Sequence, residues 1–102
     1  MRLECIAWAG GEPPSEAAVH ERLVADGFSP FQWRDAPGAV YEPHSHPHDE
    51  SLWVLAGRLD FVIDGETHRL GPGDRLQLPA NTVHAATAGP QGATYVIGQR
   101  LG

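Results

Sequence analysis

Turn signals divide the sequence after residue 30 into short segments, and this spacing limits the folds that the chain can adopt. Asp64-Gly65 is a two-residue hairpin signal, and further turns are expected at 71–74 and 88–92. Between the turns lie eight strand-like segments of four to eight residues: FQWRD, AVYEPHS, SLWVLAG, RLDFVID, THRL, DRLQLP, VHAATA and ATYVIGQR. Short strands at this spacing predict an all-β sandwich or barrel.

The N-terminal thirty residues have a different pattern. Residues 2–8 alternate as a short strand. Residues 14–26 read as a helix, with Pro13, Pro14 and Ser15 suited to its start and Gly27 to its end. LWVLA at 52–56 is apolar on both faces, so one face would line the barrel and the other needs a cover. We therefore expect one domain, in which residues 1–30 pack on a barrel formed by residues 31–102.

Composition excludes several classes of function. The formal charge of −6 argues against nucleic acid or anionic membrane as a partner. The chain has no lysine, which excludes Schiff-base chemistry on lysine, and its single cysteine, Cys5, cannot form an intrachain disulfide. No apolar run approaches the roughly 20 residues of a membrane span. We expect a soluble, cytoplasmic protein.

The stretch HSHPHDE, residues 44–50, concentrates histidine and acid in seven positions. In a strand, His44 and His46 would point to the same face, about 7 Å apart along the chain. Two imidazoles on one face are half of a coordination sphere for a metal ion. An exposed polar loop is the alternative interpretation, and this stretch alone does not choose between them.

Two sequence blocks of the chain resemble the paired motifs of the cupin superfamily. GAVYEPHSHPHDESLWVLAG, residues 38–57, matches the first motif, G-x5-H-x-H-x3,4-E-x6-G, at every fixed position. Fifteen residues later, GDRLQLPANTVHAATA carries the Gly73, Pro79 and His84 of the second motif. Asn81 replaces a family glycine, which asparagine tolerates because it adopts positive φ more readily than other non-glycine residues. Ala88 replaces a family asparagine.

The resemblance implies a double-stranded β-helix, a jelly-roll-like barrel also described as RmlC-like, with one short N-terminal helix. It also implies one divalent transition metal per chain, held in the barrel mouth by His44, His46, Glu50 and His84. Three imidazoles and a carboxylate suit Fe, Mn, Ni, Cu or Zn better than Ca or Mg. A six-coordinate metal would keep two positions open for a ligand, whereas tetrahedral zinc could close the site as a structural one.

Further residues are candidates for the surroundings of the metal. His48 is expected at the rim, because Pro47 interrupts the strand and the motif leaves position 48 free. Side chains that could wall the pocket are Trp33, Tyr41, Trp53, Tyr95 and Gln77. The alternation of the segments does not place their faces, so none is assigned a catalytic role.

The resemblance implies a metal-dependent protein that binds or acts on a small molecule. The candidates are a dioxygenase, which would be an oxidoreductase, and an isomerase-like enzyme. The alternatives are a non-catalytic, sugar-like binding or sensor module and a structural role. A homodimer is expected, because the barrel is small and LWVLA carries apolar groups on both faces. Fold resemblance does not identify the substrate.

Overall fold

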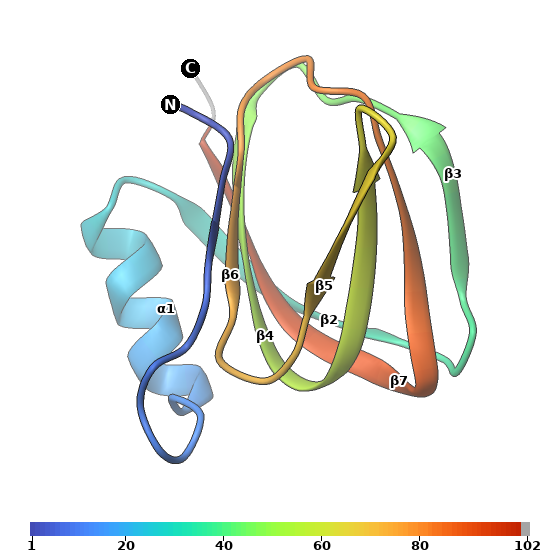
Figure 1. The fold of residues 1–102 in the computed structure, drawn as a ribbon. Coiled ribbons are helices and arrows are strands. Elements are labelled where there is room, and N and C mark those ends of the chain that lie inside the picture. The colour runs from blue at the N-terminus through green and yellow to red at the C-terminus, as the bar shows by residue number, and fades with distance from the viewer. Residues whose placement is uncertain (101–102) are drawn as a thin grey trace.

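The computed structural model describes residues 1–100, which form seven strands and one helix (Figure 1). The last two positions of the predicted 31–102 barrel lie outside these residues. All strand pairs are antiparallel, and the sheet, in the order β1-β6-β4-β7-β2, curls on itself, with β3 beside β7 and β5 beside β4. The elements are β1 (Glu4–Ile6), α1 (Glu16–Ala25), β2 (Ser29–Asp35), β3 (Val40–His44), β4 (Asp49–Ile63), β5 (Glu66–Leu70), β6 (Arg75–Leu78) and β7 (His84–Arg100). The predicted all-β class with one short helix is confirmed.

The two longest strands differ from the prediction. β4 joins the segments SLWVLAG and RLDFVID, and β7 joins VHAATA and ATYVIGQR. Both strands turn a corner where their pairing shifts register around Gly57. Gly57 and Gly92 have φ of 76° and 78° there, and a Cβ on Gly57 would lie 2.2 Å from the Gly92 carbonyl oxygen. The expected turn at 88–92 is therefore a bend inside one strand, made possible by glycine.

The other predicted turns are present where the residue types indicated them. Asp64 and Gly65 have φ of 51° and 77°, as a type I′ hairpin turn between β4 and β5 requires. Asn81 has φ of 63°, so it adopts the conformation that the glycine of the motif would. Both positions confirm that local residue choice determined these turns. Among the described residues, no helix is long and apolar enough to cross a membrane.

Helix α1 covers the outer face of the sheet. Its N-cap is Ser15, whose hydroxyl accepts a hydrogen bond of 3.1 Å from the Ala18 amide. Val19 and Leu23 are buried, and the cluster that they form with Phe28 and Val96 packs against Trp53 and Leu55. The helix is therefore the cover that the outward face of LWVLA was predicted to need.

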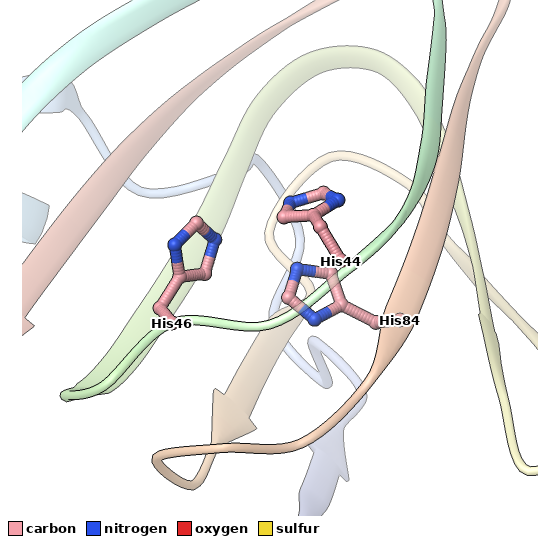
Figure 2. Close-up of side chains that lie close together, drawn as sticks. All are labelled: His44, His46 and His84. Atoms are coloured by element: carbon pink, nitrogen blue, oxygen red, sulfur yellow. The ribbon is translucent and has the colours of Figure 1, made fainter.

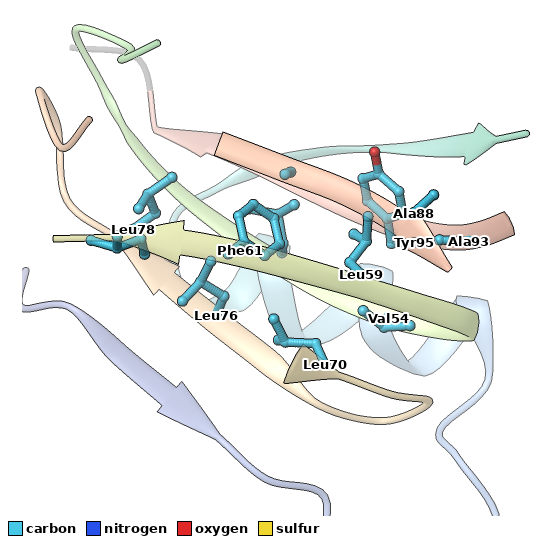
Figure 3. Packing of buried hydrophobic residues seen from close by; sticks show 12 residues of the cluster. Val54, Leu59, Phe61, Leu70, Leu76, Leu78, Ala88, Ala93 and Tyr95 are labelled. Carbon is cyan, nitrogen blue, oxygen red and sulfur yellow. The ribbon is translucent and has the colours of Figure 1, made fainter. Parts of the chain in front are cut away.

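The inward face of β4 contributes to the apolar core inside the barrel (Figure 3). Leu52 and Val54 pack there with side chains from β5, β6 and β7, including Leu70, Leu76 and Tyr95. The core does not fill the barrel completely. Leu52 and Tyr95 also line a cavity, so the core forms the walls of the site described next.

Candidate metal centre

Three histidines converge on one cavity (Figure 2). His44 ends β3, His46 follows it in the connecting segment, and His84 begins β7. The distance between ring centroids is 4.4 Å for His44 and His84, 4.9 Å for His44 and His46, and 5.3 Å for His46 and His84. One nitrogen from each ring lies within 4.8 Å of the others, which lets the three rings hold a metal ion.

Backbone carbonyls orient two of these rings. Nδ1 of His44 lies 2.6 Å from the Glu42 carbonyl oxygen, and Nδ1 of His84 lies 2.8 Å from that of Thr82. A carbonyl only accepts, so each Nδ1 carries a proton, and in the neutral ring the lone pair is on Nε2. Burial is the main reason that the pKa of His84 lies below its ordinary value, which keeps this imidazole neutral. Neutral imidazoles with free Nε2 lone pairs are in the state that binds a metal.

Glu50, the fourth predicted ligand, lies beside this cluster at the start of β4. Its side chain is buried, and Oε1 lies 3.7 Å from Nε2 of His46. Oε2 lies 3.2 Å from Nε2 of His48 and accepts a 3.2 Å hydrogen bond from the Gln99 amide. Glu50 thus forms a second group with His46 and His48, whose ligand atoms lie within 4.8 Å of one another. Imidazole nitrogens and a carboxylate are donor groups that suit a divalent transition metal.

Two loops are tied together around the histidines. The Asn81 amide donates to the His46 carbonyl oxygen at 2.6 Å, and the Ala80 amide donates to the Asp49 carboxylate at 2.8 Å. These bonds join the segment that carries His46 to the turn that precedes His84. They fix the relative position of ligands that come from distant parts of the sequence.

A bulge in β3 aims both of its functional side chains into the cavity. Tyr41 pairs with Ala86 and His44 with His84, so three steps on β3 match two steps on β7. In a regular strand, residues three apart face opposite sides. The extra residue cancels this alternation, and Tyr41 and His44 both line the cavity.

The cavity has a volume of about 250 Å³ and is mostly apolar. It is lined by Phe31, Trp33, Tyr41, His44, His46, Glu50, Leu52, Phe61, His84, Ala86, Tyr95, Ile97 and Gln99. Strand register explains this set, because Phe31 and Leu52 both pair with Ile97, and Glu50 pairs with Gln99. The lining residues that were not predicted as part of the pocket are Phe31, Leu52, Phe61, Ala86, Ile97 and Gln99. For Phe31, the alternation of FQWRD offered a signal, since it shares a face with Trp33.

A hydrogen-bonded cluster around Asp35 lies behind the aromatic wall. The carboxylate of Asp35 is buried and accepts from the indole N–H of Trp33 at 2.9 Å and from the Tyr95 hydroxyl at 2.7 Å. The Tyr41 hydroxyl also donates to it and accepts a 3.1 Å bond from Trp33. Burial and the nearby Asp35 raise the pKa of Tyr41 and of Tyr95, so both hydroxyls stay protonated. Asp35 was not predicted as part of the site.

The predicted pocket residues separate into two groups. Trp33, Tyr41 and Tyr95 line the cavity, and His48 lies beside Glu50. Trp53 and Gln77, by contrast, lie on the outer side of the sheet. The Trp53 indole donates to the Gly73 carbonyl oxygen at 2.9 Å, and Gln77 pairs with Ser51, one position out of phase with the inward Glu50. Period-two alternation turns both side chains away from the histidine cluster.

The chain is similar to known proteins in sequence and in fold. The cupin domain family matches residues 31–96. The chain is 29% identical to dimethylsulfoniopropionate lyase DddW of Ruegeria pomeroyi over 93% of this chain and 67% of the lyase. The solved structure of KdgF from Halomonas sp. has a TM-score of 0.62 and 31% identity over 72% of this chain and 68% of that one. DMSP lyase DddQ of Ruegeria pomeroyi has a TM-score of 0.66 and 26% identity, over 98% of this chain and 47% of that one. The chain thus spans under half of DddQ.

Proposed function

The chain belongs to the cupin family, and from this premise we propose that it is a metal-dependent enzyme acting on a small molecule. The observation that carries the proposal is the convergence of His44, His46 and His84 on an apolar cavity. A metal site that opens into a cavity of about 250 Å³ has room for a ligand beside the ion. A purely structural zinc site would be closed by protein ligands.

His44, His46 and His84 would hold the ion, with Glu50 available beside His46. A bound divalent metal would act as a Lewis acid toward an oxygen of the ligand. The apolar walls would exclude water from that oxygen. Glu50 and His48, joined at 3.2 Å, form a carboxylate–imidazole pair that can accept or hold a proton near the cluster.

We favour a redox-neutral reaction over dioxygenase chemistry. Two of the similar proteins are named lyases, and lyase or isomerase chemistry needs proton transfer but no oxidant. A dioxygenase is the second candidate, because three histidines and a carboxylate also suit Fe(II). A non-catalytic binding module would use the same cavity without turnover.

Metal analysis followed by paired assays tests the proposal. Protein purified without added metal should contain a divalent transition metal, and chelation should remove any activity. Loss of dimethylsulfoniopropionate, followed by nuclear magnetic resonance, tests the lyase candidate, and an oxygen electrode with small carboxylic acids and phenols tests the dioxygenase. Protein that binds no transition metal in any of these experiments would refute the proposal.

We also propose that the chain forms a homodimer through its N-terminal edge. β1 pairs with β6 along one edge, and Leu3, Ile6 and Trp8 near it are each 37–39% exposed. A strand with a free edge and apolar neighbours can add to the sheet of a second copy. Light scattering decides this point, since the monomer has a mass of 11.0 kDa and a dimer twice that value.

A further inference from the structure

The cavity has a second polar end, away from the histidines. Tyr95 and Gln99 are four residues apart on β7, which is about 13 Å along a strand. Gln99 contacts Glu50 at the histidine end of the cavity. At the far end, the carboxylate of Asp35 accepts hydrogen bonds from Trp33, Tyr41 and Tyr95. These three donors lie on β2, β3 and β7, respectively. This Asp35 cluster has no role in the proposed metal chemistry.

The donors of the Asp35 cluster are all used within the cluster. The indole N–H of Trp33 and both tyrosine hydroxyl protons point to Asp35 or to one another. A phenol has one O–H to donate and two lone pairs to accept. The oxygen of Tyr95 therefore keeps its acceptor capacity, and the pKa values of Tyr41 and Tyr95, raised by burial and by Asp35, keep both donors in place.

The wall around this end is aromatic and carries no positive charge. Among the described residues that line the cavity there is no arginine, and the chain has no lysine. Phe31 and Trp33 line the cavity and are 38% and 48% exposed, so a ligand in the cavity can reach them. Aromatic faces attract cations through the ring quadrupole, and a buried carboxylate behind them adds to this potential.

We propose that the Asp35 end of the cavity binds a positively charged head group, an ammonium or other onium centre, of the ligand. The proposal rests on the proposed function for the rest of the ligand, whose oxygen end would face the histidines. A carboxylate or phosphate at the Asp35 end would meet only acceptors and a buried negative charge, so this end discriminates against anions.

Choline and its uncharged isostere 3,3-dimethylbutan-1-ol test the head group in metal-free protein. The two probes have nearly the same shape and differ in the charge of the central atom. Choline should shift the indole N–H resonance of Trp33, and the isostere should bind at least about fivefold more weakly. The indoles of Trp8 and Trp53 serve as internal controls, because they donate to the carbonyl oxygens of Glu12 and Gly73. Equal binding of the two probes, or no shift of Trp33, would overturn the proposal.

A charge-removing variant identifies the source of the preference. Asp35→Asn should reduce the preference for choline to about twofold or less, because the aromatic faces remain but the charge is gone. Asp60→Asn is the matched control. Asp60 lies on β4 outside the cavity lining, and its carboxylate is 3.0 Å from Nε of Arg69. The Asp60→Asn variant should prefer choline over the isostere as strongly as the parent chain does. An unchanged preference in Asp35→Asn would refute the role of Asp35. If that variant does not fold, the choline and isostere comparison in the parent chain decides alone.

The same samples separate this inference from the proposed function. Zinc titration by calorimetry reports on the histidines, and choline binding without metal reports on the Asp35 end. Zinc binding without a choline preference would refute the head-group site and leave the metal site standing. A choline preference without zinc binding would refute the metal site and leave the head-group site standing.

Discussion

The two faces of β4 hold buried polar groups of opposite kinds. Glu50 and Leu52 face the cavity, and Ser51 and Trp53 face helix α1. Each layer contains a buried ionisable side chain, because Glu50 is 6% exposed and Arg75, on the outer side, is 4% exposed. The layers are built from neighbouring residues of one strand, and they differ in how those charges are satisfied.

Arg75 is held by partners within the protein. Its Nε donates to the Ser51 hydroxyl at 2.8 Å, its Nη2 donates to Asp26 at 2.9 Å, and its guanidinium lies 4.7 Å from the Trp53 ring centroid. On the inner side, His44 and His84 use Nδ1 for backbone carbonyls, which leaves Nε2 of each ring available to a ligand. A buried polar group that is hydrogen-bonded to other protein groups stabilises the fold. A buried imidazole with a lone pair that no protein group uses is available to a ligand.

The largest expected effect is loss of metal from the inner layer. His46→Ala should weaken metal binding by about a hundredfold or more, because one of three converging imidazoles is removed. His68→Ala is the control, since His68 lies on β5 beside Glu66 at 3.8 Å and outside the cluster. Metal content measured by mass spectrometry after dialysis checks the pair. Equal content in the two variants would contradict the assignment of the ligands.

The outer layer should dominate stability instead. Arg75→Ala should lower the free energy of unfolding by about 2–3 kcal/mol, because it removes a buried side chain that pairs with the partly exposed Asp26 and leaves the buried Ser51 without that partner. Glu50→Gln, which keeps the shape of the side chain, should cost about 1 kcal/mol or less in metal-free protein. Urea unfolding of both variants measures the difference. A larger loss of unfolding free energy in Glu50→Gln than in Arg75→Ala would contradict the prediction that the outer layer dominates stability.

Alkaline titration tests the polar groups of the inner layer. Tyr41 and Tyr95 are the two tyrosines of the chain, and the pKa of each lies above its usual value because of burial and of Asp35. Above about pH 10 the unfolded chain loses these protons while the folded chain keeps them, so the free energy of unfolding falls as pH rises. Ultraviolet absorbance of tyrosinate should therefore appear together with unfolding. Reversible ionisation near pH 10 in the folded protein would contradict this.

Acid titration tests the ion pair of the outer layer and should give the smallest effect. The hydrogen bond from Arg75 is the main reason that the pKa of Asp26 lies below its ordinary value. The stabilisation is present above the unfolded pKa of about 3.9 and is lost as pH falls through the lower, folded pKa. Asp26 is partly exposed, so Asp26→Asn should cost about 1 kcal/mol or less at neutral pH. Urea unfolding at neutral and acid pH should show the gap between parent and variant closing in acid.

The three histidines could be identified from the sequence, whereas Asp35, at the centre of the second cluster, could not. His44, His46 and His84 stand at fixed offsets in two motifs, so a single sequence identifies them without knowing which strands pair. Asp35, in contrast, follows an ordinary alternating segment. Its importance comes from Tyr41 and Tyr95, which are brought to it by the pairing of β2 and β3 with β7. No local pattern records that pairing.

Local chemistry determined the parts of this protein whose partners are near in sequence. Ser15 caps its own helix, Asp64-Gly65 makes its own turn, and Asn81 adopts positive φ, because each depends on backbone preferences over a few residues. Tertiary structure decided the rest. Gly57 and Gly92 bend two long strands where separate ones were predicted, and the bulge in β3 turns Tyr41 and His44 to the same side. Register and bulges depend on hydrogen bonds between strands far apart in the chain, so only the folded sheet specifies which side chains share the cavity.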